Sequence, residues 1–284
     1  MQNHKICLIG YGYWGKILHK NLSALGHQDI TIFDKVLDNL DKINDSFDYY
    51  FVATPFTTHE ETLLSLSKFK GKKIWCEKPL ASSLGSVNQI YELLESNGNH
   101  LFVDWIYLFN PAIDFIKKKI KGKRIKQAIL NRTNDGPVRT DCTSIWDLSS
   151  HDISIVLKLF GDKNYNFNWN EFSIKNHENM GSNVSWTYFQ GTQIIINSSW
   201  QHSKKNRVSV FITDDDQTIV FDDIKKMVTL SDGEVYDFSC ERSPMESALQ
   251  YFFESDEFSE NKKITQRITA HLTNQNIKNG GNKI

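Results

Sequence analysis

Short apolar runs alternate with amphipathic segments through the first 110 residues of the chain. Glycine, proline or polar residues bound each run, and the segments between them repeat apolar residues at helical spacing. Strands that alternate with helices indicate a parallel sheet with right-handed crossovers. The runs predicted to form its strands are residues 6–9, 29–33, 49–53, 73–76 and 100–104.

From about Arg124 onward the pattern changes to alternating runs separated by turn signals such as Asp232-Gly233. Alternation indicates strands with one buried face, and a series of such strands predicts an open, mostly antiparallel sheet. The predicted strands are residues 125–132, 184–189, 193–200, 207–212, 218–221, 227–230 and 235–238. Apolar residues recur at helical spacing in residues 145–160, 244–254 and 263–272, which are therefore predicted to form helices.

The two patterns together predict an α/β protein with two domains. The 284 residues suffice for two domains of ordinary size. We expect residues 1–122 to form a Rossmann domain, a doubly wound parallel sheet that binds a dinucleotide. We expect residues 123–284 to form an α+β domain around the open, mostly antiparallel sheet.

Composition and charge argue against several classes of protein. The 33 Lys and Arg against 34 Asp and Glu give a formal net charge of −1, whereas nucleic-acid binders usually carry a basic excess. The basic stretch at residues 117–126 is interpreted as the solvated end of a helix. No apolar run approaches the roughly 20 residues that cross a bilayer, and residues 6–9 lead into glycines rather than into a secretory signal.

The cysteines and the charged residues suggest no metal site. The 4 cysteines lie far apart and form no C-x-x-C pair. We expect them to be reduced thiols in a cytoplasmic protein.

A glycine-rich turn follows the first predicted strand and leads directly into a helix. Its G-x-G-x-x-G spacing, placed between a strand and a helix, is typical of dinucleotide binding. The first glycine permits a tight turn, the second lets the backbone approach a pyrophosphate, and the third lets the helix pack on the strand. The residues of this turn predicted to bind the cofactor are Gly10, Gly12, Tyr13, Trp14 and Gly15.

Asp34 ends the second predicted strand, at about the distance from the glycine loop that is typical of the ribose-binding acid. A carboxylate there accepts hydrogen bonds from the ribose hydroxyls and repels a 2′-phosphate, which favours NAD over NADP. The neighbouring Lys35 weakens this preference, because a cation would tolerate the phosphate. The alternative role for Asp34 is to cap the following turn.

Further candidate residues follow the next two strands. Functional groups of doubly wound sheets lie at the carboxyl ends of strands. The residues in or near these ends that we expect to bind the cofactor are Thr54, Pro55, His59, Glu77 and Lys78.

The order of these motifs resembles that of the Gfo/Idh/MocA oxidoreductases. The resemblance covers the first 160 residues well and the remainder mainly by architecture. It implies an NAD(P)-dependent oxidoreductase that acts on CH–OH groups. The motifs that carry it are the glycine loop, Ala53-Thr54-Pro55, Glu77-Lys78-Pro79, Asn110-Pro111 and Asp147-x-x-x-His151.

The resemblance implies that Lys78 is the catalytic general acid/base. Oxidation of an alcohol sends a hydride to nicotinamide and a proton to a base, and a desolvated lysine is able to take that proton. A lysine is more often a solvated surface charge. Lys78 differs because it follows a buried strand and precedes a proline.

The helix expected at residues 145–160 brings Asp147 and His151 onto one face, four positions apart. The resemblance favours them as catalytic and substrate-binding residues over a capping Asp and a buried structural His. Lys78 is expected to contact the substrate as well. Further substrate-binding candidates are Tyr107, Asn110 and Arg139.

The resulting prediction is an NAD-dependent oxidoreductase for a sugar, with a nucleotide-activated sugar as the favoured substrate. One alternative is a dehydrogenase or ketoreductase for a free sugar or cyclitol, and another is a non-catalytic dinucleotide sensor. The family resemblance also implies a homodimer or homotetramer formed through the C-terminal sheet.

Overall fold

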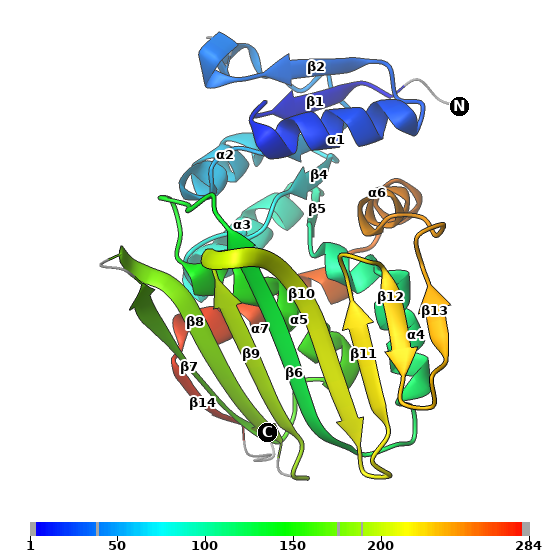
Figure 1. Cartoon of the computed structure of the whole chain (residues 1–284). Coiled ribbons are helices and arrows are strands. Elements are labelled where there is room, and N and C mark those ends of the chain that lie inside the picture. The colour runs from blue at the N-terminus through cyan, green and yellow to red at the C-terminus, as the bar shows by residue number, and fades with distance from the viewer. Residues whose placement is uncertain (1–3, 38–39, 175–176, 189, 280–284) are drawn as a thin grey trace. The chain divides into compact units, whose positions relative to one another are not determined.

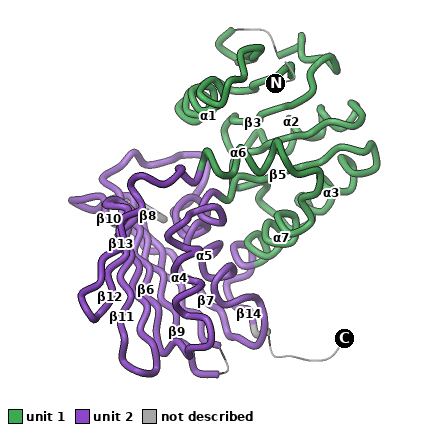
Figure 2. The backbone as a smooth tube through the Cα atoms, turned by 90° about the vertical axis from the view of Figure 1, so that its right-hand side faces the viewer, with its two compact units in different colours: residues 1–105, 245–270 green, residues 106–244, 271–284 purple. Residues whose placement is uncertain are grey.

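The computed structural model describes residues 4–37, 40–174, 177–188 and 190–279. They form two compact units, each built from two stretches of the chain (Figure 2). Unit 1 comprises residues 1–105 and 245–270, and unit 2 comprises residues 106–244 and 271–284. This division differs from the one expected from the sequence, which ended the first domain at residue 122.

Unit 1 is built around a five-stranded sheet whose neighbouring strands are all parallel (Figure 1). The strand order is β2-β1-β3-β4-β5, so the chain reverses direction across the sheet between β1 and β3. Ligands of such sheets bind beside the carboxyl ends of the strands at this reversal. The strands are β1 Ile6–Ile9, β2 Ile30–Phe33, β3 Tyr49–Val52, β4 Lys73–Cys76 and β5 His100–Val103.

Three helices of unit 1 connect these strands. The buried positions of α1 (Tyr13–Ala24) include Leu18 and Leu22, whose spacing of four places them on one face. Helix α2 (His59–Leu66) follows a short 3-10 turn. Helix α3 (Leu84–Ser96) begins after Ser83, whose side chain accepts a hydrogen bond from the Ser86 amide.

Two helices from the end of the chain also belong largely to unit 1. Helix α6 (Pro244–Glu254) places the ring of Phe252 against those of Phe51 and Trp75, with centroids 5.3 and 5.6 Å apart. In α7 (Ser259–Thr273) the Asn261 amide group both accepts from the Val103 N–H and donates to the Val103 carbonyl, at 2.8 Å each. These contacts explain why residues 245–270 join the first unit rather than the second.

Unit 2 is built around a nine-stranded sheet of order β13-β12-β11-β10-β6-β9-β8-β7-β14. Its described strand pairs are antiparallel except β6 with β9, which run parallel, so the expected mostly antiparallel sheet is confirmed. Strands β7 and β14 were not predicted, and the last residue of the predicted strand 184–189 lies outside the described residues. The strands are β6 Ile125–Asp135, β7 Tyr165–Ile174, β8 His177–Tyr188, β9 Gln193–Ser199, β10 Gln201–Thr213, β11 Thr218–Asp222, β12 Met227–Leu230, β13 Val235–Asp237 and β14 Asn276–Asn279.

Helices α4 (Pro111–Lys119) and α5 (Ser150–Phe160) belong to unit 2. The expected helix at residues 145–160 begins with a π-helical segment, Ile145–Ser149, and continues as α5. Its Ser149 hydroxyl lies 3.0 Å from that of Ser182 and 2.8 Å from that of Ser198. These contacts fix the start of the helix against β8 and β9.

Candidate active site

The glycine loop between β1 and α1 is too crowded for side chains at two positions. Gly10 has φ +91°, and a Cβ there would lie 2.7 Å from the carbonyl carbon of Ala53. A Cβ on Gly15 would lie 2.1 Å from the carbonyl oxygen of Gly10. The loop, the first turn of α1 and the end of β3 therefore approach one another as closely as backbone allows.

The N-terminus of α1 is suited to an anionic ligand. Gly12 caps the helix without a side-chain hydrogen bond, and no described atom lies within 4 Å of a Cβ placed on it. Tyr13 is 75% exposed and Trp14 is 36% exposed. The N–H groups of this first turn are thus available to the phosphates of a dinucleotide.

Asp34 connects the end of β2 to the glycine loop. Its Oδ2 accepts a hydrogen bond of 2.6 Å from the Tyr11 amide, and its Oδ1 accepts one of 2.8 Å from the Val36 amide. The carboxylate therefore performs the capping role considered from the sequence. A carboxylate has about four acceptor positions, so these two amide hydrogen bonds do not by themselves occupy all of them.

The ends of β3 and β4 carry the next group of candidate residues. The Thr54 hydroxyl is buried without a hydrogen-bond partner among the described residues. Pro55 precedes a 3-10 turn, and its carbonyl accepts from the Thr58 amide at 2.9 Å. His59 is 1% exposed, and its ring nitrogens lie 2.9 and 2.8 Å from the carbonyl oxygens of Thr54 and Pro79.

Glu77 and Lys78 follow β4 and are 6% and 7% exposed. Asp104, at the end of the adjacent β5, is 3% exposed, and its amide donates to the Cys76 carbonyl at 2.9 Å. Burial raises the pKa of the Asp104 carboxyl well above its ordinary value, the charge of Glu77 raises it further, and Lys78 opposes the shift. Asp104 was not among the predicted site residues, although a carboxyl group directly after a buried strand is a sequence signal for a functional residue.

A dinucleotide fits these features of unit 1. The close backbone approach at Gly10 and Gly15, the open N-terminus of α1 and the buried Thr54 hydroxyl lie at the ends of β1 and β3, where the strand order reverses. Nucleotide sites of doubly wound sheets occupy this position.

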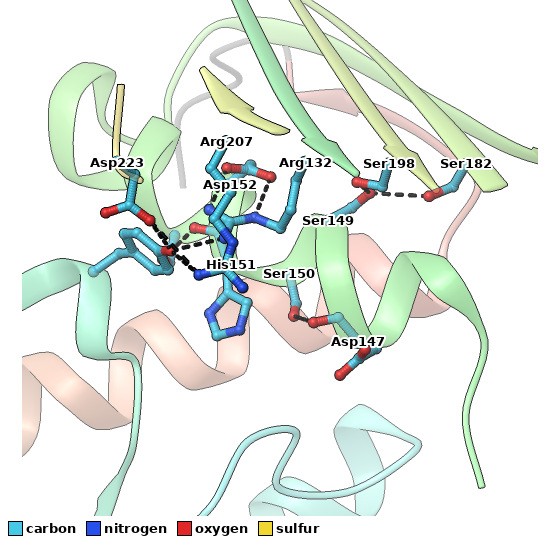
Figure 3. A network of polar contacts seen from close by, with 12 residues as sticks. Arg132, Asp147, Ser149, Ser150, His151, Asp152, Ser182, Ser198, Arg207 and Asp223 are labelled. Carbon is cyan, nitrogen blue, oxygen red and sulfur yellow. Dashed lines mark hydrogen bonds and ion pairs between the residues drawn. The ribbon is translucent and has the colours of Figure 1, made fainter. Parts of the chain in front are cut away.

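Unit 2 holds the two polar residues predicted on the helix at residues 145–160. In Figure 3 the Asp147 carboxylate and the His151 ring extend on the side of the helix away from the strands. Asp147 lies in the π-helical segment and is held from two directions: Trp200 Nε1 donates to it at 3.0 Å and Arg139 Nη1 at 3.3 Å. The ring of His151 packs edge-to-face against that of Tyr107 at 5.2 Å.

Arg139 contacts carboxylates of its own unit. Its Nε and Nη2 donate to the two oxygens of Asp141 at 2.8 and 2.6 Å. The Asp141 hydrogen bonds make the largest contribution in raising the pKa of Arg139 above its ordinary value. In this structure the guanidinium thus fixes the loop that precedes the helix.

The other two substrate candidates, Tyr107 and Asn110, belong to a buried network with Arg132 and Asp223, which are labelled in Figure 3. The Tyr107 hydroxyl donates to Asp223 at 2.7 Å and accepts from Arg132 Nη1 at 2.8 Å. Asn110 caps α4 by accepting from the Ala112 amide at 2.9 Å. Tyr107 and Asn110 are 3% and 5% exposed, so in this structure both side chains lie in the interior of unit 2 and form hydrogen bonds there.

A buried ion pair lies at the centre of this network. Arg132 Nε and Nη2 each donate to an oxygen of Asp152 at 2.8 Å, and both side chains are less than 5% exposed. Burial alone lowers the pKa of Arg132, but the Asp152 carboxylate and the Tyr107 hydroxyl together more than compensate and raise this pKa well above its ordinary value. Because Asp152 follows His151 directly, the pair also fixes the backbone that carries His151.

A cavity of unit 2 is separate from these residues. It has a volume of about 970 Å³ and lies at the C-terminal end of α5, where Leu159 and Phe160 line it together with the exposed Lys117 and Lys118. Among the described residues, no group of three or more His, Cys, Asp or Glu side chains is arranged to hold a metal ion. Every helix in the described ranges falls short of the length and apolarity needed to cross a membrane.

The fold and the glycine cradle of unit 1 are those of a nucleotide-binding Rossmann unit. Residues 19–105 match the Gfo/Idh/MocA model, described as an oxidoreductase family with an NAD-binding Rossmann fold. The match to this region confirms the resemblance found from the motifs.

Individual relatives agree with this assignment. The uncharacterized oxidoreductase YrbE of Bacillus subtilis (strain 168) is 24% identical over 183 residues, which cover 55% of this chain and 53% of YrbE. The matched region thus spans about half the length of that relative.

Solved structures resemble the chain over nearly its whole length. A putative oxidoreductase from Magnetospirillum magnetotacticum MS-1 has a TM-score of 0.79 and 21% identity, covering 95% of this chain and 99% of that one. UDP-N-acetylglucosamine 3-dehydrogenase GnnA from Acidithiobacillus ferrooxidans has a TM-score of 0.82 and 16% identity, covering 96% of each chain. At sequence identities of 21% and 16%, these structural similarities establish the fold alone.

The buried ion pair of unit 2 makes a stability prediction. Arg132→Met leaves the Asp152 carboxylate buried without its cation, so the free energy of unfolding of unit 2 should fall by about 3–5 kcal/mol. Denaturant unfolding followed by circular dichroism measures the change. Lys126→Met is the control, because it removes an exposed pair with Asp216 and should leave stability close to that of the wild type. A loss no larger than the control's would contradict the assignment.

Proposed function

We propose that the protein is an NAD-dependent oxidoreductase that acts on a hydroxyl or ketone of a sugar, with a nucleotide-activated sugar as the favoured substrate. The observation that carries the proposal is the position of Lys78, buried at the carboxyl end of β4 in the same unit as the glycine cradle. The family of residues 19–105 supports the chemistry. The fold shared with UDP-N-acetylglucosamine 3-dehydrogenase supports the substrate class.

Lys78 is the proposed general acid/base. NAD, when bound, supplies the hydride acceptor or donor. Oxidation of a hydroxyl also releases a proton, which the neutral amine of Lys78 takes, and in the reverse direction its ammonium returns the proton to the ketone oxygen. The low exposure of Lys78 shields this transfer from bulk water.

Asp147 and His151 are the proposed substrate-orienting residues of unit 2. Both project on the same side of the helix, and Arg139 and Trp200 hold the Asp147 carboxylate in one orientation. A fixed carboxylate accepts from a sugar hydroxyl at little entropic cost, and the imidazole of His151 donates to or accepts from the reacting oxygen. Arg139 then acts through Asp147 in this proposal.

Asp34 makes a prediction about cofactor choice. Because its carboxylate would face and repel a 2′-phosphate, NADH should bind at least about tenfold more tightly than NADPH. A tenfold ratio of affinities is a difference of about 1.4 kcal/mol in binding free energy. Fluorescence titration with both cofactors measures the ratio. Lys35→Ala is the matched test of the opposing cation and should widen the difference. Equal or tighter binding of NADPH would show that Lys35 outweighs Asp34.

Lys78→Met tests the catalytic proposal, because it keeps the side-chain stem and removes the titrating group. With NAD and a panel of sugars that includes UDP-N-acetylglucosamine, turnover should fall by roughly 10²–10⁴. Binding of NADH should remain, since the glycine loop and Asp34 are unchanged.

Two further variants complete that experiment. His151→Asn should also reduce turnover if the histidine contacts the reacting oxygen. Lys68→Met, at an exposed position of unit 1, is the control and should match the wild type. Unchanged turnover in Lys78→Met would refute its role as acid/base. Absence of turnover on every sugar, together with NADH-dependent binding of a protein partner, would favour a sensor.

We further propose that the protein forms a homodimer through the sheet face opposite α5. On that face Asn183 donates to Asn197 at 2.7 Å, and Asn197 donates to Asn131 at 2.9 Å, which forms a row across three strands. The next row contains the partly exposed Ile195 and Ile129, which are register partners. A flat surface of this kind, apolar with satisfied amides, suits a symmetric contact between two copies.

Ile195→Arg should therefore convert the dimer into a monomer, because it places a charge at the centre of the contact. Light scattering coupled to size-exclusion chromatography measures the mass. Ile224→Arg, at a site that is 49% exposed in a turn, is the control and should remain dimeric. A wild-type protein that is monomeric at micromolar concentration would exclude this interface.

A further inference from the structure

Both ring nitrogens of His59 face atoms that only accept hydrogen bonds. Nδ1 lies 2.8 Å from the Pro79 carbonyl oxygen and Nε2 lies 2.9 Å from the Thr54 carbonyl oxygen. A neutral imidazole has one N–H and one bare lone pair. One of the two contacts would then set a nitrogen lone pair against an oxygen lone pair, in a residue that is 1% exposed.

We propose that His59 is a buried imidazolium that donates to both carbonyls and thereby acts as a positioning residue for Lys78. The two carbonyls belong to the segments that follow β3 and β4, and Pro79 is the immediate neighbour of Lys78. Two donations from one rigid ring fix the separation of these segments. They also place a positive charge close to the strand end that carries the proposed acid/base.

Opposing factors act on the charge of His59. Burial of the ring, which is 1% exposed, disfavours the charged form, and the position of His59 as the first residue of α2 also opposes a cation, because the N-terminus of a helix is its positive end. Against this, hydrogen bonds from a charged donor are stronger than neutral ones, and the neutral ring would leave one of the two N···O contacts without a proton. Glu60 and Glu61 occupy the first turn of the same helix, and Glu77 lies on the same strand end as Lys78.

The proposed charge has a consequence for the chemistry. A nearby cation disfavours the ammonium form of a lysine and favours the neutral amine that accepts a proton. The titratable groups on the adjoining strand ends are Glu77, Lys78 and Asp104. The effect on proton transfer rests on the function proposed above, whereas the protonation of His59 does not.

Nuclear magnetic resonance of protein with isotope-labelled histidine tests the protonation directly. At about pH 8, above the ordinary range of a free imidazole, both ring nitrogens of His59 should carry a proton that exchanges slowly with water. The signal is assigned by replacing the other histidines one at a time, so the assignment does not require a His59 variant that folds. One unprotonated ring nitrogen at that pH would overturn the proposal.

The link to Lys78 is tested in the intact protein with isotope-labelled lysine. His59→Gln retains an N–H donor group but carries no charge, so the pH midpoint at which the Lys78 Cε signal titrates should rise by roughly 0.5–1 pH unit. His100→Gln, an exposed histidine of the same unit, is the control and should leave the midpoint unchanged. An unchanged midpoint in folded His59→Gln would refute the positioning role. Neither measurement needs a substrate, so failure here and failure of the proposed reaction are distinguishable.

Discussion

The close backbone contact between the glycine loop, the first turn of α1 and the end of β3 is the constraint from which the rest of unit 1 follows. A Cβ on Gly10 or Gly15 would lie within 2.7 Å of backbone atoms, so the contact exists only because both side chains are absent. It draws the helix N-terminus to the point where the strand order reverses. The chain then adds polar groups around that point: Asp34 after β2, Thr54 after β3 and Lys78 after β4.

Unit 2 depends on a different interaction, the buried pair of Arg132 and Asp152. Arg132 projects from β6 and reaches both Asp152 on α5 and the hydroxyl of Tyr107. Breaking such a pair costs far more than its formation contributes, because the partner left behind is a buried charge. The pair therefore enforces one position of α5 on the sheet, and with it one position of His151.

The sequence pattern predicted most elements of unit 1 because buried parallel strands are short, continuous apolar runs. It predicted the strands of unit 2 less completely. In β7 the aromatic residues Tyr165, Phe167 and Trp169 alternate with asparagines. This alternation of period two is typical of a strand, although β7 was not predicted. The π-helical start of the helix with Asp147 could not be read in this way, since one inserted residue barely alters apolar spacing.

Long-range contacts account for the remaining differences. The apolar face of α6 was visible in the sequence, but nothing in its spacing states which sheet Phe252 covers. The domain boundary expected at residue 122 was therefore set by chain order rather than by contacts. Arg132 is another example: it stands in phase with the buried Ala128 and Leu130, so its inward direction was predictable, although its partner Asp152 was not.

Both units contain buried charges that are satisfied internally and buried polar atoms without hydrogen-bond partners among the described residues; in unit 2 the latter include Ser144 Oγ and Arg207 Nε. In unit 2 the charged side chains beside His151 are satisfied internally: Arg139 by Asp141, Asp147 by Trp200, and Arg132 by Asp152. In unit 1 the Thr54 hydroxyl and the Asp104 Oδ1 are buried without hydrogen-bond partners among the described residues. Each such atom costs about 1–3 kcal/mol. A fold tolerates that cost where a ligand supplies the missing partner, so a ligand beside the carboxyl end of β3 would satisfy the Thr54 hydroxyl.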